Sequence, residues 1–200
     1  MANALATKTQ SDNFALAAAH AHSSTIVGER LRFSKGRFLI GRGDGEPLPA
    51  GATFEVHDVQ AAWVKFIDGR IVDQRVGYPM PARDELDDID EAAWPIGPDG
   101  KPQDPWSNQR YLYLIDPESG RELTFVTSSV YGRAAVETLA SQIAIKRRSA
   151  PGAIAVVRPE AGYKPSRSYG AIPAPKFPIV VWSGMEEPAS NGDLDDEIPF

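Results

Sequence analysis

The sequence predicts a mainly β body of the α+β class, in which an antiparallel barrel of five or six strands carries one helix. Two observations favour this class. Short apolar segments recur between clusters of turn residues, which is typical of strands joined as hairpins. One longer stretch, residues 130–147, instead repeats its apolar residues every three or four positions, which is typical of a helix that packs by one face.

The clearest hairpin is predicted for residues 62–67 and 70–76. The dipeptide Asp68-Gly69 between them supplies the positive φ angles that a type I′ turn needs. Two further hairpins are expected around Lys35-Gly36 and around the longer turn at residues 116–120. Short apolar runs predict the remaining strands at residues 53–56, 153–157 and 178–182.

Residues 26–182 are expected to form one domain, because a chain of this length usually holds one core. Residues 1–25 are rich in Ala, Ser and Thr without a clear period and predict a flexible arm. Residues 183–192 predict a flexible linker. Within the domain, residues 78–108 carry six prolines and predict a long loop. The last eight residues, 193–200, follow the linker.

The net charge of −6 is unevenly distributed. Residues 183–200 contain six acidic residues and no Lys or Arg, so they carry the whole −6, and residues 1–182 are balanced. A second acidic cluster occupies residues 84–91. The rest of the body is therefore basic, above all from 121 to 176, and this basic part is suited to binding phosphate.

Aromatic residues interleave with basic residues in this body. A groove for a single nucleic-acid strand needs this mixture, because cations follow the phosphates while rings stack on bases. The candidate residues for binding single-stranded DNA are Trp63, Lys65, Trp94, Trp106, Tyr111, Tyr113, Lys146, Arg147, Arg148, Arg158, Tyr163, Lys164, Arg167 and Tyr169.

Structural roles for some of these candidates stay open. The indoles of Trp94 and Trp106 would equally pin the long loop to the body. The three cations at 146–148 end the predicted helix, where they would complement the negative end of its dipole. The basic segment 158–176 would equally be a surface loop.

The C-terminus ends a polar tail with apolar side chains, which predicts an anchor for a partner's pocket. The Phe200 ring would fill such a pocket, its terminal carboxylate would bind an Arg, and the acidic residues would steer toward basic surfaces. The residues expected to bind a partner are Asp193, Asp195, Asp196, Glu197, Ile198, Pro199 and Phe200.

The sequence Asp-Leu-Asp-Asp-Glu-Ile-Pro-Phe at the extreme C-terminus resembles the tip of bacterial single-stranded DNA-binding proteins. The resemblance covers residues 193–200 only. It implies that the tip recruits repair helicases, a 3′ exonuclease and recombination mediators. The family's core is an oligonucleotide-binding (OB) fold, so the resemblance implies an OB-like barrel here. That fold places its helix between its third and fourth strands, whereas at least five candidate strands precede the helix predicted in this chain.

We therefore expect a phage- or prophage-like protein that coats single-stranded DNA in replication, recombination and repair. The first alternative is an adaptor or inhibitor that mimics the tip to capture a repair enzyme without binding DNA. The second is an enzyme that holds Mg²⁺ on the carboxylates of residues 84–91, although no basic or histidine partner of recognisable spacing accompanies them. No nucleophile elbow, P-loop or zinc motif is present.

The amino-acid composition bears on disulfides, metal centres and membrane segments. The absence of cysteine excludes disulfides and cysteine-ligated metal centres. No apolar run approaches the ~20 residues of a membrane helix. We expect a cytoplasmic protein without cofactor, bound metal, catalytic residues or membrane partner, and leave open whether it assembles with copies of itself.

Overall fold

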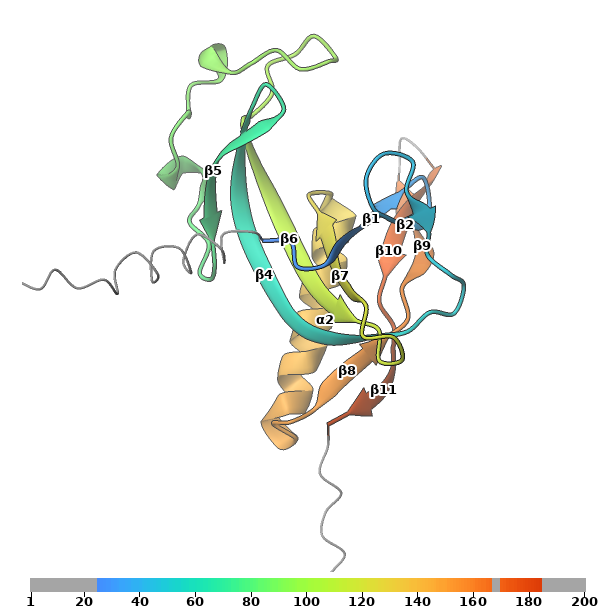
Figure 1. The fold of residues 1–200 in the computed structure, drawn as a ribbon. Helices are drawn as coiled ribbons and strands as arrows, with labels where there is room; N and C mark the ends of the chain where they lie inside the picture. Colours follow the sequence, from blue (N-terminus) through green and yellow to red (C-terminus); the bar gives the residue numbers. More distant parts are fainter. Residues whose placement is uncertain (1–24, 167–169, 185–200) are drawn as a thin grey trace, which may run out of the picture.

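The structure, a computed structural model, describes residues 25–166 and 170–184. This part of the chain is mostly β, with one α-helix (Figure 1). The strands are β1 (Glu29–Ser34), β2 (Arg37–Ile40), β3 (Glu46–Pro47), β4 (Phe54–Ile67), β5 (Arg70–Val76), β6 (Trp106–Ile115), β7 (Glu122–Thr127), β8 (Ile154–Val157), β9 (Glu160–Ser166), β10 (Gly170–Lys176) and β11 (Ile179–Ser183). The helices are α2 (Val130–Ser149) and two 3₁₀ turns, Arg83–Glu85 and Glu91–Ala93.

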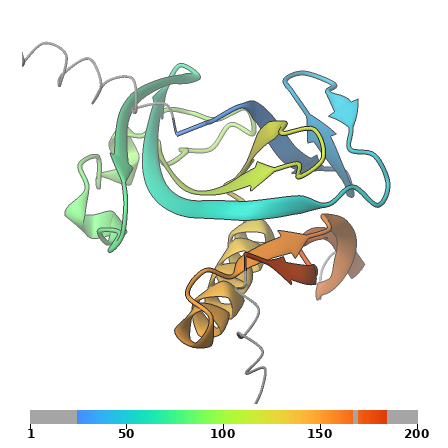
Figure 2. The same ribbon diagram turned by 60° about the horizontal axis from the view of Figure 1, so that its bottom comes forward.

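The long strand β4 organises the main sheet, whose order is β11-β8-β4-β6-β7-β1-β2-β3. One end of β4 pairs with β8 and the other end with β5, while β6 follows β4 along most of its length. An irregularity between Val56 and Asp58 interrupts the β4–β6 register, and β4 bends strongly along its length (Figure 2).

The sheet is mixed, because β1 runs parallel to β7 while the other strand pairs are antiparallel. Among the described residues, no strand pair joins β11 to β3, so the sheet remains open. The mainly β, α+β class predicted from the sequence is confirmed, whereas the closed barrel is not.

The predicted hairpins form where their turn residues indicate. Asp68 and Gly69 take φ angles of 50° and 74°, as a type I′ turn requires, and Lys35 and Gly36 take 50° and 79°. The predicted helix extends to Ser149, and the Ser129 hydroxyl caps its start by accepting a hydrogen bond from the Gly132 amide at 3.1 Å. None of the described helices is long and apolar enough to cross a membrane.

The structure differs from the predicted elements at three places. The strand predicted at residues 53–56 is only the start of β4, because pairing with β6 continues through the polar residues that follow. Strand β6 begins at Trp106, inside the predicted loop. The basic segment 158–176 forms the β9–β10 hairpin, a separate two-stranded sheet. A two-stranded sheet has two outer edges, so it tolerates prolines that lack an N–H donor.

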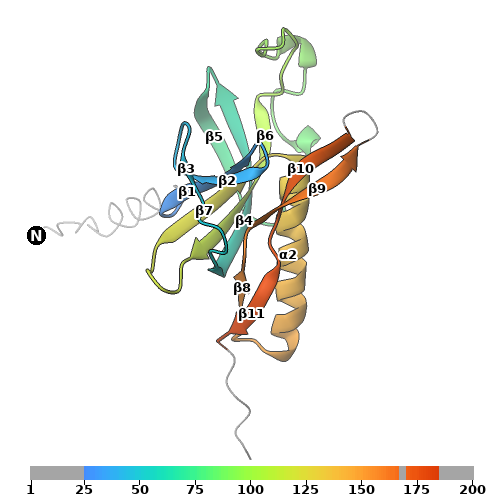
Figure 3. The ribbon, with the colours of Figure 1, turned by 90° about the vertical axis from the view of Figure 1, so that its right-hand side faces the viewer.

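The core lies between the main sheet and α2. Val136, Leu139 and Ile143 form the buried stripe of the helix, at the spacing expected for one helical face. Phe177, between β10 and β11, packs edge-on against Phe125 at 5.0 Å between ring centroids. This contact ties the β9–β10 hairpin to the core, and the hairpin lies beside α2 (Figure 3).

Candidate nucleic-acid interface

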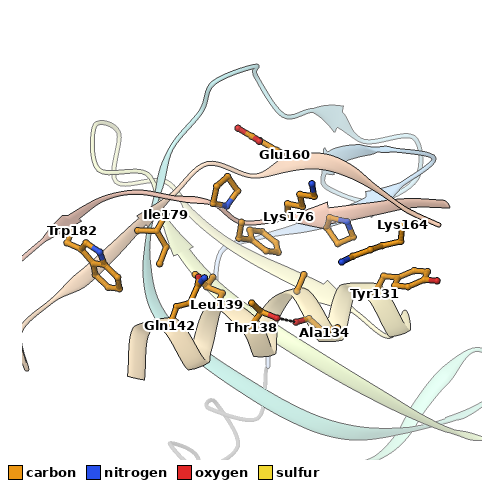
Figure 4. Close-up of a pocket in the computed structure, with 14 residues that line it drawn as sticks. Tyr131, Ala134, Thr138, Leu139, Gln142, Glu160, Lys164, Lys176, Ile179 and Trp182 are labelled. Atoms are coloured by element: carbon orange, nitrogen blue, oxygen red, sulfur yellow. Dashed lines mark hydrogen bonds between the residues drawn. The ribbon is translucent and has the colours of Figure 1, made fainter. Parts of the chain in front are cut away.

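A groove lies between α2 and the strands β9 to β11 (Figure 4). Trp182 lies at one end of this groove, while Tyr131 and Lys164 lie at the other. The helix contributes Tyr131, Ala134, Ala135, Thr138, Leu139 and Gln142. The strands and their connections contribute Glu160, Lys164, Pro175, Lys176, Phe177, Pro178, Ile179 and Trp182.

One face of α2 lines the groove, as the spacing of its lining residues shows. Tyr131, Ala135, Thr138 and Gln142 follow one another at intervals of three or four residues, so they share one face beside the buried stripe. The Thr138 hydroxyl donates to the Ala134 carbonyl at 2.8 Å, as the dashed line in Figure 4 shows. The helix therefore presents small and uncharged side chains between its two ends.

The register of the β9–β10 pair determines where the two lysines of the groove lie on the hairpin. Lys176 lies opposite Glu160 in the β9–β10 pair, and Lys164 lies opposite Ile172. The stem of Lys176 crosses Gly162 so closely that a Cβ on this glycine would lie 2.2 Å from the Lys176 Cε. Gly162 therefore gives Lys176 the room to lie across the hairpin.

The charge of the groove is mainly positive. Neither Lys164 nor Lys176 forms an ion pair within the described part of the chain, whereas Arg158 pairs with Glu160 at 2.7 Å. The Lys146 ammonium lies 5.9 Å from the centre of the Trp182 ring. Unpaired cations beside aromatic and apolar surface suit an anionic ligand that also has flat apolar parts.

Of the predicted residues, Lys164 lines this groove and Lys146 lies beside its Trp182 ring, but the sequence missed three of the groove's side chains. Lys176 ends β10, Trp182 lies within β11, and Tyr131 belongs to the first turn of the helix. Aromatic and basic character at the borders of a basic segment is the signal that could have found them. Only the packing of the hairpin against α2 brings these borders together.

The predicted residues Trp94 and Trp106 instead hold the long loop in place. The Trp106 indole N–H donates to the Asp87 carboxylate at 2.8 Å, and the Trp94 indole N–H donates to the Asp88 carbonyl at 2.7 Å. Trp106 is only 3% exposed. Of the two roles left open, the contacts support the pinning of the loop.

The predicted residues Trp63 and Lys65 belong to the same cluster. The Trp63 indole N–H donates to the Pro81 carbonyl at 3.0 Å, while the Lys65 ammonium pairs with Asp87 at 3.1 Å and also with Asp88. Both strand residues therefore contact the loop that covers them. The four candidates nearest the loop lie together, but their polar groups are already bound inside the protein.

The acidic cluster at residues 84–91 also has structural contacts. Its Asp90 carboxylate caps the second 3₁₀ turn, and the Glu85 carboxylate accepts from the Ala82 amide. Next to the cluster, Arg83 binds both carboxylate oxygens of Asp104 at 2.7 and 2.8 Å. Within residues 25–166 and 170–184, no three His, Asp or Glu side chains gather as a metal site would require.

Acidification is expected to release this loop. The hydrogen bond from Lys65 is the main cause that lowers the pKa of Asp87 below its ordinary value of about 4. A carboxyl whose pKa is lowered by folding stabilises the fold above the ordinary pKa, and that contribution is lost as the pH falls through the lowered pKa. Tryptophan fluorescence should therefore change below about pH 4, and the change should weaken in Asp87→Asn. Identical pH profiles for the two proteins would contradict this expectation.

The predicted residues Tyr111 and Tyr113 lie on the face of the main sheet that is opposite to α2. Residues 25 and 26 lie next to them. Burial leaves Tyr111 3% exposed and raises its pKa to about 12. The Tyr113 hydroxyl donates to the Thr25 carbonyl at 2.9 Å. Val27 and the Thr124 hydroxyl exchange two hydrogen bonds, of 2.9 and 2.6 Å, which hold this segment in place.

The remaining candidate residues lie at the end of α2, on the β9–β10 hairpin, or outside the described residues. The Arg147 guanidinium donates to the Ala153 carbonyl just beyond the helix, at 2.9 Å, which supports its structural alternative, while Arg148 is exposed. Tyr163 is 65% exposed on the outside of the hairpin. Arg167 and Tyr169 lie outside the described residues, as do all the tip residues at 193–200.

Comparisons of this chain with protein-family models, with curated proteins and with solved structures find no match. Function must therefore be inferred from the topology, the groove and the tip.

Proposed function

We propose that this protein binds single-stranded DNA with an OB-like body and recruits partner proteins through its C-terminal tip. The observation that carries the proposal is the topology. Strands β4, β6 and β7 follow one another as antiparallel neighbours, and β8 returns after α2 to pair with β4. This is the spatial order 4-1-2-3 of a Greek key.

An OB fold is a partly open Greek-key barrel of five strands. Strand β11 supplies a fifth strand beside β8, and α2 lies between the third and fourth strands of this set. Seven strands of the described chain, β1 to β7, precede the helix, so four of them are additions to this set. The β1–β3 segment is an N-terminal extension, and β5 with its loop is an insertion between the first and second strands.

The topology also supports a position for the ligand. OB folds bind oligonucleotides with the loops that follow their first and fourth strands, together with the face of their second and third strands. The loop after the fourth strand corresponds here to the β9–β10 hairpin. This hairpin carries the exposed Tyr163, together with Lys164 and Lys176, which have no ion pair among the described residues, so we propose that it binds the strand with the groove beside α2.

The tip supports the second half of the proposal through its resemblance to bacterial single-strand binders. Its four carboxylates and its terminal Ile-Pro-Phe combine long-range steering with an apolar anchor. A basic pocket on a repair or replication protein is the partner that this chemistry fits.

Removing both groove lysines is expected to weaken DNA binding. Lys164→Ala/Lys176→Ala should lower the affinity for labelled oligo(dT) about tenfold and reduce the salt slope of log K by about 1.4, because two phosphate contacts are lost. The matched control, Arg42→Ala/Lys101→Ala, removes two exposed cations elsewhere and should change affinity much less. Equal losses in both variants would show that only overall charge matters.

The adaptor alternative has one observation in its favour, since five of the predicted aromatic residues have internal contacts. Titrating the full chain and a variant lacking residues 193–200 with oligo(dT) separates the two functions. A DNA binder should bind in both forms, and more tightly without the acidic tip. If neither form binds DNA, the adaptor function replaces the proposed one.

A further inference from the structure

Strand β5 is an edge strand with an apolar surface. Among the residues that the structure describes it pairs with β4 alone, and Ile71, Val72 and Val76 are 59%, 53% and 51% exposed. Figures 1 and 3 show β5 on the far side of the main sheet from the β9–β10 hairpin. A free edge that exposes β-branched side chains is a template for a further strand.

The main-chain hydrogen-bonding groups of β5 point toward β4 and away from it at alternate residues. The Gly77 amide donates to the Ala61 carbonyl at 2.9 Å, so Gly77 is directed toward β4. Because alternate residues of an antiparallel pair bond to the same neighbour, the main-chain groups of Gln74 and Val76 are directed away from β4. In the single chain the Gln74 N–H donates to the Asp73 carboxylate at 2.7 Å, so pairing with a second copy must replace this hydrogen bond.

The sequence of this edge is complementary to itself. When residues 72–76, Val-Asp-Gln-Arg-Val, run antiparallel to a second copy about Gln74, each Asp73 faces Arg75, and Val72, which lies at the irregularity of the β4–β5 register, comes opposite Val76. The two Gln74 residues then face each other through their outward main-chain groups. Apolar and opposite-charge pairs at directly opposed positions stabilise an antiparallel pair.

We propose that two copies of this protein form a two-fold dimer by pairing their β5 strands. The partner is a second copy because a two-fold axis through Gln74 satisfies both charges of the segment. Asp73 and Arg75 pair with each other at 3.1 Å within one copy, so forming the dimer exchanges the pair within each copy for two pairs across the axis. The proposal does not depend on DNA binding, and it leaves the groove of each copy open.

The interface is short, so the dimer should depend on concentration. Sedimentation velocity of the full chain over about a hundredfold range of concentration should show a monomer–dimer equilibrium. Asp73→Arg should be monomeric, because two guanidinium groups would then face each other across the axis. Arg75→Asp should be monomeric for the converse reason, since two carboxylates would be opposed. An equimolar mixture of these two variants should form a heterodimer, because every charge then faces an opposite charge.

The mixing experiment separates pairing from misfolding, since two misfolded chains would not rescue each other. Val72→Lys should also abolish the dimer, whereas Val181→Lys should not, although Val181 on β11 is a 54% exposed valine of another edge strand. A full chain that stays monomeric at every concentration, or a mixture without heterodimer, would overturn the proposal. If the full chain is monomeric but a variant lacking residues 1–24 dimerises, those residues cover β5 instead.

Discussion

Phe177→Ala is expected to lower the free energy of unfolding by about 3 to 5 kcal/mol. The Phe177 ring is 6% exposed and lies 5.0 Å from Phe125 and 5.6 Å from Phe38, so truncation leaves a cavity inside the aromatic core. Because this residue joins the β9–β10 hairpin to the core, the variant should also lose affinity for oligo(dT). Urea unfolding and a DNA titration on the same samples would measure both effects.

Tyr163→Ala is the matched control for this variant. Tyr163 belongs to the same hairpin but is 65% exposed, so its removal should change the unfolding free energy by less than about 0.5 kcal/mol. If its ring stacks on a base, affinity should fall by about 1 to 3 kcal/mol without loss of stability. A Phe177→Ala protein as stable as wild type would show that the aromatic cluster does not anchor the hairpin.

Gly28→Ala is expected to cost about 2 to 4 kcal/mol of folding free energy. Gly28 has a φ of 66°, and a Cβ there would lie 2.1 Å from the carbonyl oxygen of Glu122. Backbone atoms cannot move aside as a flexible side chain can, so the segment from Thr25 to Gly28 must separate from β7. Thermal unfolding would measure the loss, and exposure of Tyr113 would be visible in its ultraviolet absorbance.

Comparison with Gly51→Ala separates the cost of the steric clash with Glu122 from the cost of the positive φ angle. Gly51 also has a positive φ, of 80°, but a Cβ there would have no neighbour within 4 Å. Its substitution should therefore cost only the backbone strain, about 1 kcal/mol. Similar losses in the two variants would indicate that the conformation alone, rather than contact with Glu122, requires glycine at position 28.

The contacts change which candidate residues are suited to bind DNA. Trp63, Trp94 and Trp106 donate their indole N–H groups inside the protein, and the Trp106 and Tyr111 side chains are buried. The groove beside α2 is more suitable because Lys164 and Lys176 form no ion pair within residues 25–166 and 170–184. The basic hairpin, rather than the tryptophans, is therefore the part of the body on which we base DNA binding.

Local sequence determined the elements whose signals depend on few residues. Asp68-Gly69 alone sets the turn of the β4–β5 hairpin, because the required φ angles exclude most other residues. The spacing of Val136, Leu139 and Ile143 determined the helix and its buried face. The tip at residues 193–200 is likewise a local motif, whose role stays a prediction.

Tertiary structure decided which of the aromatic and basic side chains form contacts inside the protein and which line the groove. A tryptophan in a proline-rich loop has the same local pattern whether it stacks on a base or pins the loop, and only the position of its hydrogen-bond acceptor distinguishes the two. Trp106 finds that acceptor in Asp87, nineteen residues earlier in the chain. Lys164 lines the groove and has no ion-pair partner in the part of the chain that the structure describes. Long-range contacts of this kind depend on how the strands pair and pack, which composition and spacing do not encode.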